Sequence, residues 1–240
     1  TRYFMSKGRL YLIPVPLGQT EAAAVLPQPV LACAQALAHF VAENAKSARA
    51  FLKSLPANLP LQQIGIAELN EHTPDSALPR LLEPLLAGND VGLISEAGCP
   101  AVADPGATLV ALAHQAGIKV VPMVGPSSIL LALMASGLTG QGFTFHGYLP
   151  SATQEREKRL RELEKDSKQW QRTQIFIETP YRNRQMLESL LKACAPDTRI
   201  CLATDLTLDS EQIRTRPVSA WQAQPLPEIN RRPTVFLLHA

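Results

Sequence analysis

The first half of the chain alternates short apolar runs with amphipathic stretches. The apolar runs, each bounded by polar or turn-forming residues, predict strands at residues 9–13, 39–43, 63–69, 90–94 and 118–122. The stretches between them repeat apolar side chains every three or four positions and predict helices at residues 28–37, 44–55, 75–87 and 108–116. Because strands and helices alternate, we expect a parallel sheet with helices on both faces and with loops gathered at the carboxyl ends of its strands.

The pattern loosens after Pro122. A corner of Gly, Pro and Ser at 124–128 leads into an apolar helix at 129–136, and further apolar runs predict strands at residues 143–149, 173–178, 199–203 and 234–239. A charged helix is expected at 154–168, and a long proline-bearing segment precedes the last strand. We therefore expect two α/β domains: an N-terminal domain at 1–122 with a mainly parallel sheet, and a mixed C-terminal domain at 123–240.

Charge gives little indication of a partner. The formal net charge of the chain is +2, too small for the strong electrostatic footprint of a dedicated nucleic-acid binder, so RNA is neither implied nor excluded. In the helix at 154–168 the positive and negative side chains nearly cancel. Such a helix is typical of a solvated face with ion pairs one turn apart, and an RNA-binding patch is the alternative.

Composition favours a globular protein outside the membrane. The chain is 46% hydrophobic and 18% charged, and its longest apolar stretch, Ile129–Ala135, falls far short of the roughly 20 residues that a spanning helix needs. No secretory signal pattern is visible, so we expect a cytoplasmic location. Residues 1–4 precede Met5, a candidate natural start, and we give them no functional weight.

The sequence lacks the motifs that several common chemistries require. The four cysteines form no CxxC pair and have no histidine at zinc-ligand spacing, so we expect free thiols and no metal site. The chain contains no GxGxxG, GxxxxGK[ST], GxSxG or HExxH motif. Dinucleotide binding, P-loop phosphoryl transfer, serine hydrolysis and zinc proteolysis are therefore all disfavoured.

Three loops rich in Gly and Pro follow predicted strands, at residues 14–18, 95–106 and 124–128. In an open parallel sheet such loops meet at one crevice, where helix N-termini and unpaired backbone N–H groups bind ligands. By spacing alone the loops at 14–18 and 124–128 are typical of ordinary connections. The loop at 95–106 is longer than a tight crossover needs, and spacing leaves it equally balanced between a connection and a binding site.

The order of several segments is more specific than any one of them. The chain begins with a strand that ends in a turn of Pro and Gly, and a long loop and several shorter motifs follow it. In order, these segments are LYLIPVPLG at 10–18, SEAGCPAVADPG at 95–106, VPMVGPSS at 121–128, SGL at 136–138, GYLP at 147–150, IETPYR at 177–182 and RPTVFLL at 232–238. In this order, over nearly the whole chain, they resemble the tetrapyrrole-methylase superfamily. Within it they are most similar to the branch of the small-subunit ribosomal RNA 2′-O-ribose methyltransferase.

Three segments depart from that branch. An acidic EDTR-like element is replaced by Glu43-Asn44-Ala45-Lys46, and an RELTK-like segment is replaced by residues 204–208, TDLTL. Glu96 stands where the family loop has Asp. The chain therefore resembles a sister subgroup of the rRNA enzymes, and the cofactor of the superfamily transfers to it more safely than the substrate.

The resemblance implies a homodimer of two-domain chains, with S-adenosylmethionine (AdoMet) in a cleft between the domains and no metal. The cofactor contacts that it implies are Pro14, Leu17, Gly18, Glu96, Ala97, Gly98, Ser127, Ser128, Leu149, Pro233 and Thr234. The leading interpretation is an AdoMet-dependent methyltransferase acting on RNA, namely the ribose 2′-oxygen of ribosomal RNA. The alternatives are a methyltransferase for a tetrapyrrole or another small molecule, and a non-catalytic AdoMet-binding protein.

A hydroxyl nucleophile favours a general base. The candidates are Glu43, Glu71 and Asp104, which all lie near predicted strand ends. Carboxylates at such positions more often cap a helix or make a structural hydrogen bond, and Asp104, before Pro105 and Gly106, is especially typical of a turn. The sequence does not rank the three.

Overall fold

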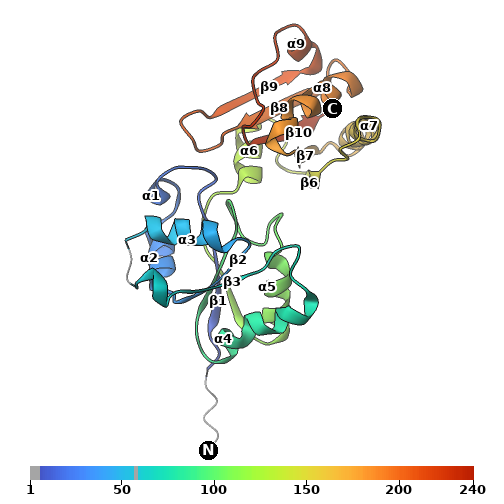
Figure 1. Cartoon of the computed structure of the whole chain (residues 1–240). Coiled ribbons are helices and arrows are strands. Elements are labelled where there is room, and N and C mark those ends of the chain that lie inside the picture. The colour runs from blue at the N-terminus through green and yellow to red at the C-terminus, as the bar shows by residue number, and fades with distance from the viewer. Residues whose placement is uncertain (1–5, 57–58) are drawn as a thin grey trace, which may run out of the picture. The chain divides into compact units, whose positions relative to one another are not determined.

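The computed structural model describes residues 6–56 and 59–240, so the interpretation of residues 1–4 lies outside the described part. The chain divides into two compact units, residues 1–127 and 128–240, which we call unit 1 and unit 2 (Figure 1). Each unit has its own five-stranded sheet. The two units are described separately below.

Unit 1 is built on a parallel sheet. Its strands are β1 (Arg9–Ile13), β2 (His39–Ala42), β3 (Gly65–Glu68), β4 (Val91–Ile94) and β5 (Lys119–Pro122). They pair in the order β3-β2-β4-β1-β5, and every pairing is parallel. The parallel sheet expected from the alternating pattern is confirmed.

Helices cover both faces of this sheet. On one face, α1 (Ala22–Val25), α2 (Gln28–Ala36) and α3 (Ala45–Ser54) pack against a cluster that includes Phe40 and Ile94. On the other face, α4 (Glu83–Leu86) and α5 (Gly106–Gln115) pack against a cluster that includes Leu10 and Leu93 (Figure 1). The faces differ because the chain crosses the sheet in opposite directions before and after β3, and such crossovers are right-handed.

Two predicted elements of unit 1 are shorter than expected. The segment 75–87 is not one α-helix but a 3₁₀ helix, η2 (Asp75–Leu82), followed by the short α4. Pro79 lies inside η2, where it has no backbone N–H to donate, and this opposes a regular α-helix. The predicted strand at 63–69 begins only at Gly65, because a 3₁₀ turn, η1 (Leu61–Gln63), precedes it.

Unit 2 has a mixed sheet. Its strands are β6 (Phe143–Tyr148), β7 (Thr173–Ile177), β8 (Arg199–Thr204), β9 (Gln212–Pro217) and β10 (Thr234–His239), in the order β6-β7-β10-β8-β9. Only β6 and β7 pair in parallel. The antiparallel strand β9 was not predicted and forms part of the proline-bearing segment before β10.

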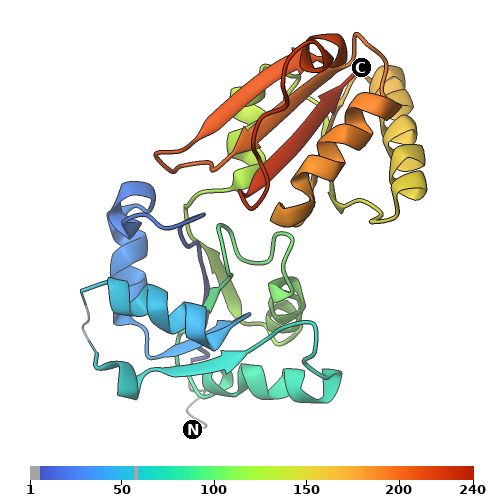
Figure 2. The same ribbon diagram turned by 45° about the horizontal axis from the view of Figure 1, so that its top comes forward.

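The main core of unit 2 lies under three helices, as Figure 2 shows in orange, yellow and dark red. These are α7 (Thr153–Trp170), α8 (Asn183–Ala193) and α9 (Val218–Gln222), and they bury Leu160, Leu190 and Trp221 against Phe176 and Phe236. A short 3₁₀ turn, η3 (Pro180–Arg182), leads into α8. The apolar helix α6 (Ser128–Ser136) contacts β8, β9 and β10.

Candidate functional site

β4 is the central strand of the parallel sheet, so its carboxyl end lies in the middle of the sheet's carboxyl edge. β4 leads to α5 on one face, whereas its neighbours β1 and β2 lead to α2 and α3 on the other face. Where neighbouring strands send their chains to opposite faces, the loops diverge and a crevice opens at the carboxyl ends of the strands. The Ser95–Gly106 loop leaves the sheet at this point.

The first and second Gly/Pro loops are joined by backbone hydrogen bonds. Val15 N–H donates to the Gly98 carbonyl and Gly98 N–H donates to the Val15 carbonyl, both at 3.1 Å. Gly98 adopts a φ of +69°, which favours glycine, and a Cβ there would lie 3.0 Å from Leu17 Cδ2. The pairing fixes Pro14–Gly18 beside the Ser95–Gly106 loop.

The third loop lies against both of the others. Cys99 Sγ donates to the Pro126 carbonyl at 3.4 Å. A Cβ built on Gly125 would lie only 2.2 Å from Pro14 Cβ, so glycine allows the β5 loop to touch the β1 loop. The structure thus brings together all three loops that the sequence singled out.

Within the second loop, Asp104 acts as a turn residue. Its Oδ1 accepts hydrogen bonds from Ala101 N–H at 2.7 Å and Gly106 N–H at 2.8 Å. Burial raises the pKa of the Asp104 carboxyl, and the two backbone N–H groups oppose that shift. Ala101 and Ala103 have φ values of 64° and 57°, so the loop holds two non-glycine residues in the left-handed region. The structural role expected for Asp104 agrees with these contacts.

Carboxylates gather around Glu43, the residue that follows β2. Partial burial raises the pKa of Glu43, and repulsion from Asp104, Glu96 and Glu71 raises it further. Glu96 Oε2 accepts a hydrogen bond from Ser47 Oγ at 3.2 Å. Glu71 is highly exposed, with 86% of its side chain accessible, and it lies 3.5 Å from His72. Of the three candidate bases, Glu43 alone combines partial burial with a carboxyl free of the turn contacts that occupy Asp104.

The segment that replaces the family's EDTR-like element forms the start of α3. Asn44 is the N-cap, and its Oδ1 accepts hydrogen bonds from Lys46 N–H at 2.9 Å and Ser47 N–H at 3.2 Å. Glu68 Oε1 accepts from Ala45 N–H at 2.9 Å. The altered residues thus begin a helix directly after Glu43.

The remaining predicted cofactor residues belong to unit 2. Leu149 is buried just after β6, and Thr234 begins β10, where its Oγ1 lies 3.0 Å from Thr204 Oγ1. Pro233 precedes it, and the Pro233 carbonyl accepts from Asp205 N–H at 2.9 Å. Ser127 and Ser128 lie at the junction between the two units.

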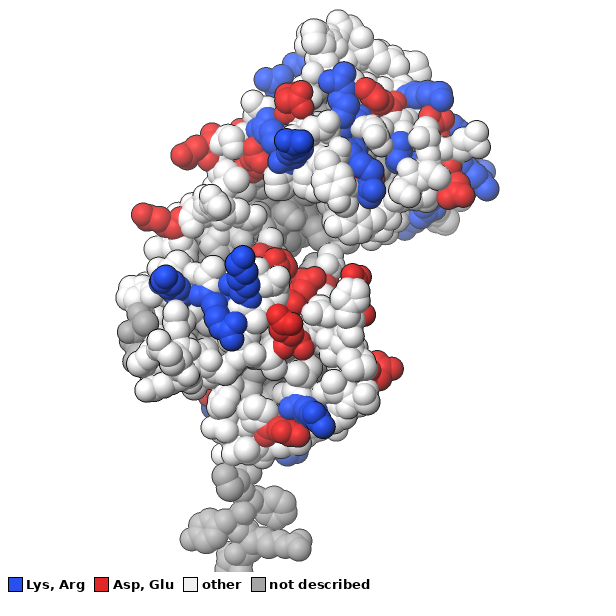
Figure 3. Space-filling model, viewed as in Figure 1, with Lys and Arg blue, Asp and Glu red and all other residues white. Residues whose placement is uncertain are grey.

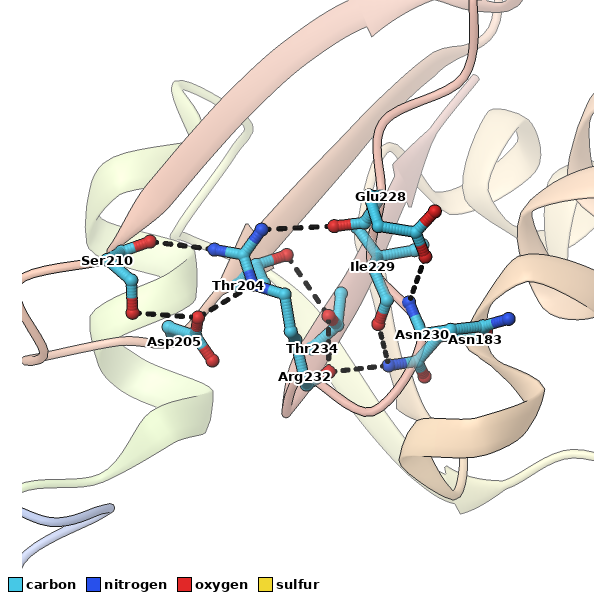
Figure 4. A network of polar contacts seen from close by, with 9 residues as sticks. All are labelled: Asn183, Thr204, Asp205, Ser210, Glu228, Ile229, Asn230, Arg232 and Thr234. Carbon is cyan, nitrogen blue, oxygen red and sulfur yellow. Dashed lines mark hydrogen bonds and ion pairs between the residues drawn. The ribbon is translucent and has the colours of Figure 1, made fainter.

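A network around Arg232 fixes the start of β10 (Figure 4). The Arg232 guanidinium donates to Asp205 Oδ2 at 2.7 Å, to the Ser210 carbonyl at 2.8 Å and to the Glu228 carbonyl at 3.0 Å. Asn183 Nδ2 donates to the Arg232 carbonyl at 2.6 Å. Arg232 opens the RPTVFLL motif, but the pairing with Asp205 is a long-range contact that no local pattern could reveal.

We expect Arg232→Ala to lower the free energy of unfolding by about 2 kcal/mol, because it removes charge-assisted hydrogen bonds and leaves Asp205, whose side chain is 8% exposed, without its cation. Arg184→Ala is the matched control, since its ion pair with Glu188 is exposed on one helix and should contribute less than about 0.5 kcal/mol. Urea unfolding measures both variants. Equal losses would contradict the structural role of Arg232.

Within the described part of the chain, no group of three or more His, Cys, Asp or Glu side chains is placed to hold a metal ion. No helix of that part is long and apolar enough to cross a membrane. The four cysteines are free thiols, as expected, and burial raises the pKa of Cys194 to about 12.

Comparison with solved structures shows the fold. The methyltransferase CobJ matches with a TM-score of 0.63 at 19% identity, covering 97% of this chain and 94% of that one. The cobalt precorrin-4 methyltransferase CbiF matches with a TM-score of 0.61 at 14% identity, covering 96% and 94%. The expected tetrapyrrole-methylase fold is confirmed.

Sequence comparison is more specific. Ribosomal RNA small subunit methyltransferase I of Vibrio cholerae is 33% identical over 88% of this chain and 69% of that protein. The protein of the same name from Pseudomonas aeruginosa is 32% identical over 90% of this chain and 72% of its own length. The model of the tetrapyrrole (corrin/porphyrin) methylases matches residues 9–221. The chain is therefore a methyltransferase that belongs to the tetrapyrrole methylase family, on the branch of ribosomal RNA small subunit methyltransferase I.

Proposed function

We propose that this protein transfers the methyl group of AdoMet to a ribose 2′-hydroxyl of ribosomal RNA in the small subunit. The observation that carries the proposal is the likeness, over most of the chain, to relatives named ribosomal RNA small subunit methyltransferase I. Two features of unit 1 support the proposal: three loops in mutual contact at the carboxyl edge of the parallel sheet, and the carboxyl group of Glu43, whose pKa is raised.

The residues of the three loops fit the chemistry of AdoMet. The cofactor has a carboxylate that needs donors, an amino group and an adenine that need acceptors, and a sulfonium best placed against an apolar wall. Glu96 and Ala97 are exposed, and their backbone N–H groups have no acceptor among the described residues. We assign apolar contacts to Pro14 and Leu17, and backbone contacts to Gly18, Gly98, Ser127 and Ser128; Pro14 and Gly98 are buried, and the other four are half-buried. The family resemblance further implies cofactor contacts at Leu149, Pro233 and Thr234 of unit 2.

The protein's part in the reaction is to align the hydroxyl and to take its proton. AdoMet, when bound, supplies a methyl group already activated by the positive sulfur, so no metal is needed. The ribose oxygen forms the new bond to carbon as the carbon–sulfur bond breaks. We assign Glu43 as the base that accepts the hydroxyl proton, because its raised pKa brings it closer to the working pH than an ordinary carboxylate.

Methyl transfer from labelled AdoMet tests the function. The purified protein is incubated with small ribosomal subunits, total RNA and the small-molecule fraction, all from a strain that lacks the protein. We expect the label in small-subunit RNA. Label in the small molecules would instead assign a tetrapyrrole-like acceptor, and AdoMet binding without transfer to any fraction would assign a non-catalytic role.

We also propose a cytoplasmic homodimer. The homodimer rests on the family resemblance, and the location rests on the proposed ribosomal substrate. Sedimentation of the purified chain at micromolar concentration should give twice the 26.1 kDa mass of one chain. A single species at the mass of one chain would contradict the dimer.

A further inference from the structure

Every charged side chain on the exposed face of α3 is a cation. Lys46, Arg49 and Lys53 are exposed and occur at positions i, i+3 and i+7, which share one side of a helix, and α3 contains no Asp or Glu. Figure 3 shows Lys and Arg gathered over α3, directly beside a group of Asp and Glu side chains of the same unit. At 1.5 Å per residue, the three cations extend over about 10 Å of surface.

These cations are not used to hold the fold together. Among the ion pairs and side-chain hydrogen bonds of the described residues, none involves the Lys46, Arg49 or Lys53 side chain. The helix α7 carries Lys158, Arg161 and Lys165 at the same spacing, but acidic side chains alternate with them along that helix. The same residue types therefore produce a positive face on α3 and a nearly neutral one on α7.

The cationic face starts at the carboxylates of the candidate site. Two hydrogen bonds hold the first turn of α3: Ser47 Oγ donates to Oε2 of Glu96, one of those carboxylates, at 3.2 Å, and Ala45 N–H donates to Oε1 of Glu68, at the end of β3, at 2.9 Å. Glu43 is separated from α3 only by the N-cap residue, Asn44. The cations and the proposed base thus belong to one continuous segment of unit 1, residues 43–53.

A polyanion would be repelled by the carboxylates around Glu43 unless cations nearby offset them. We propose that Lys46, Arg49 and Lys53 bind consecutive phosphates of the RNA substrate and hold its backbone beside Glu43. The inference rests on the proposed function and assigns it an RNA-binding surface. Phosphate contacts of this kind position the strand without reading its sequence.

The salt dependence of RNA binding tests this surface. Binding of a fluorescent single-stranded RNA to the full chain is measured at several KCl concentrations. The variant K46Q/R49Q/K53Q should bind more weakly, and its plot of log affinity against log salt should be flatter by about 2, since each phosphate contact contributes roughly 0.7 on a single strand. The control K158Q/R161Q/K165Q removes the same charges at the same spacing from α7 and should leave the slope near that of the unsubstituted protein.

Several results would overturn the inference. It fails if the salt-dependence slope of RNA binding falls equally in the α3 and α7 variants, or if it is unchanged in both. It also fails if the unsubstituted protein does not bind RNA. If poly-glutamate of matched charge bound as tightly as the RNA, the α3 face would instead be assigned as a binding surface for an acidic protein. Unchanged AdoMet affinity and thermal unfolding in the α3 variant show that it is folded.

Failure of the proposed function and failure of the RNA-binding surface give different results. If α3 carries RNA binding but no fraction accepts a methyl group, the RNA surface stands and the methyl acceptor is wrong. If small-subunit RNA is methylated equally well by the α3 variant and the unsubstituted protein, the function stands and the surface is wrong.

Discussion

Glu43→Gln is expected to reduce methyl transfer by roughly 100-fold or more while AdoMet affinity stays unchanged. The reason is that a positioned general base contributes about 10² to 10⁴ in rate, and glutamine cannot accept the hydroxyl proton. The amide is close in size and shape to the carboxyl, so the half-buried position is still filled. Single-turnover transfer from labelled AdoMet gives the rate, and calorimetry gives the affinity.

Glu71→Gln distinguishes the candidate bases. If Glu43 is the base, Glu71→Gln retains activity, because Glu71 acts only as a nearby negative charge that helps to raise the pKa of Glu43. Activity requires ionised Glu43 and therefore falls as the pH drops through that raised pKa. Removing the charge of Glu71 lowers the pKa of Glu43, so the acid limb of the pH–rate profile should move to lower pH. Loss of activity in Glu71→Gln, with activity retained in Glu43→Gln, would reverse the assignment.

Gly125→Ala is expected to disrupt the contact between the β1 and β5 loops at the proposed cofactor site. The new Cβ would lie 2.2 Å from Pro14 Cβ and 2.5 Å from Pro14 Cγ, so the β1 and β5 loops must separate. Overpacking of this kind costs about 1–3 kcal/mol of stability, and a displacement of about 1 Å at a reacting centre can cost about 100-fold in rate. Urea unfolding should show the loss of stability, AdoMet calorimetry should show weaker binding, and methyl transfer from labelled AdoMet should show the loss of rate.

Gly140→Ala serves as the control for this substitution. No heavy atom lies within 4 Å of a Cβ at Gly140, so the same chemical change should alter neither stability nor AdoMet binding by a measurable amount. If Gly125→Ala also bound AdoMet with unchanged affinity, the close contact between the β1 and β5 loops would have no role in the cofactor site.

The sequence predicted unit 1 well because its pattern is local. Buried parallel strands are short apolar runs, and helices between them repeat their apolar positions, so both periods can be read directly. Loops 14–18, 95–106 and 124–128 follow such strands, and a parallel sheet necessarily brings them to one edge. The contacts of Gly98 with Val15 and of Cys99 with Pro126 agree with that expectation.

Unit 2 was less predictable because antiparallel pairing joins distant segments. The strand β9 reads QIRTRP, which lacks a continuous apolar run because its residues are exposed or only half-buried. The Asp205–Arg232 ion pair joins residues 27 positions apart, and Asp205 has a φ of 52°. These features depend on tertiary contacts, so neither periodicity nor spacing could indicate them.

Two of the departures from the rRNA branch, at the EDTR-like and RELTK-like segments, gain a structural interpretation. Glu43-Asn44-Ala45-Lys46 provides a strand-end carboxylate, an N-cap and the first cation of α3, so the altered residues form a structured part of the site. In the other segment, Asp205 is held by Arg232, Ser210 and the backbone. This segment is therefore part of a structural network in unit 2.

The position of the transferred methyl group tests the central proposal most directly. Small subunits from a strain lacking the protein are incubated with the purified protein and labelled AdoMet. Their RNA is then digested with alkali, which cleaves only where a free 2′-hydroxyl can attack the neighbouring phosphate. We predict that the label is recovered in alkali-resistant dinucleotides, and that Glu43→Gln abolishes this product. Label in mononucleotides, in the small-molecule fraction or in no fraction would contradict methylation of a ribose 2′-oxygen.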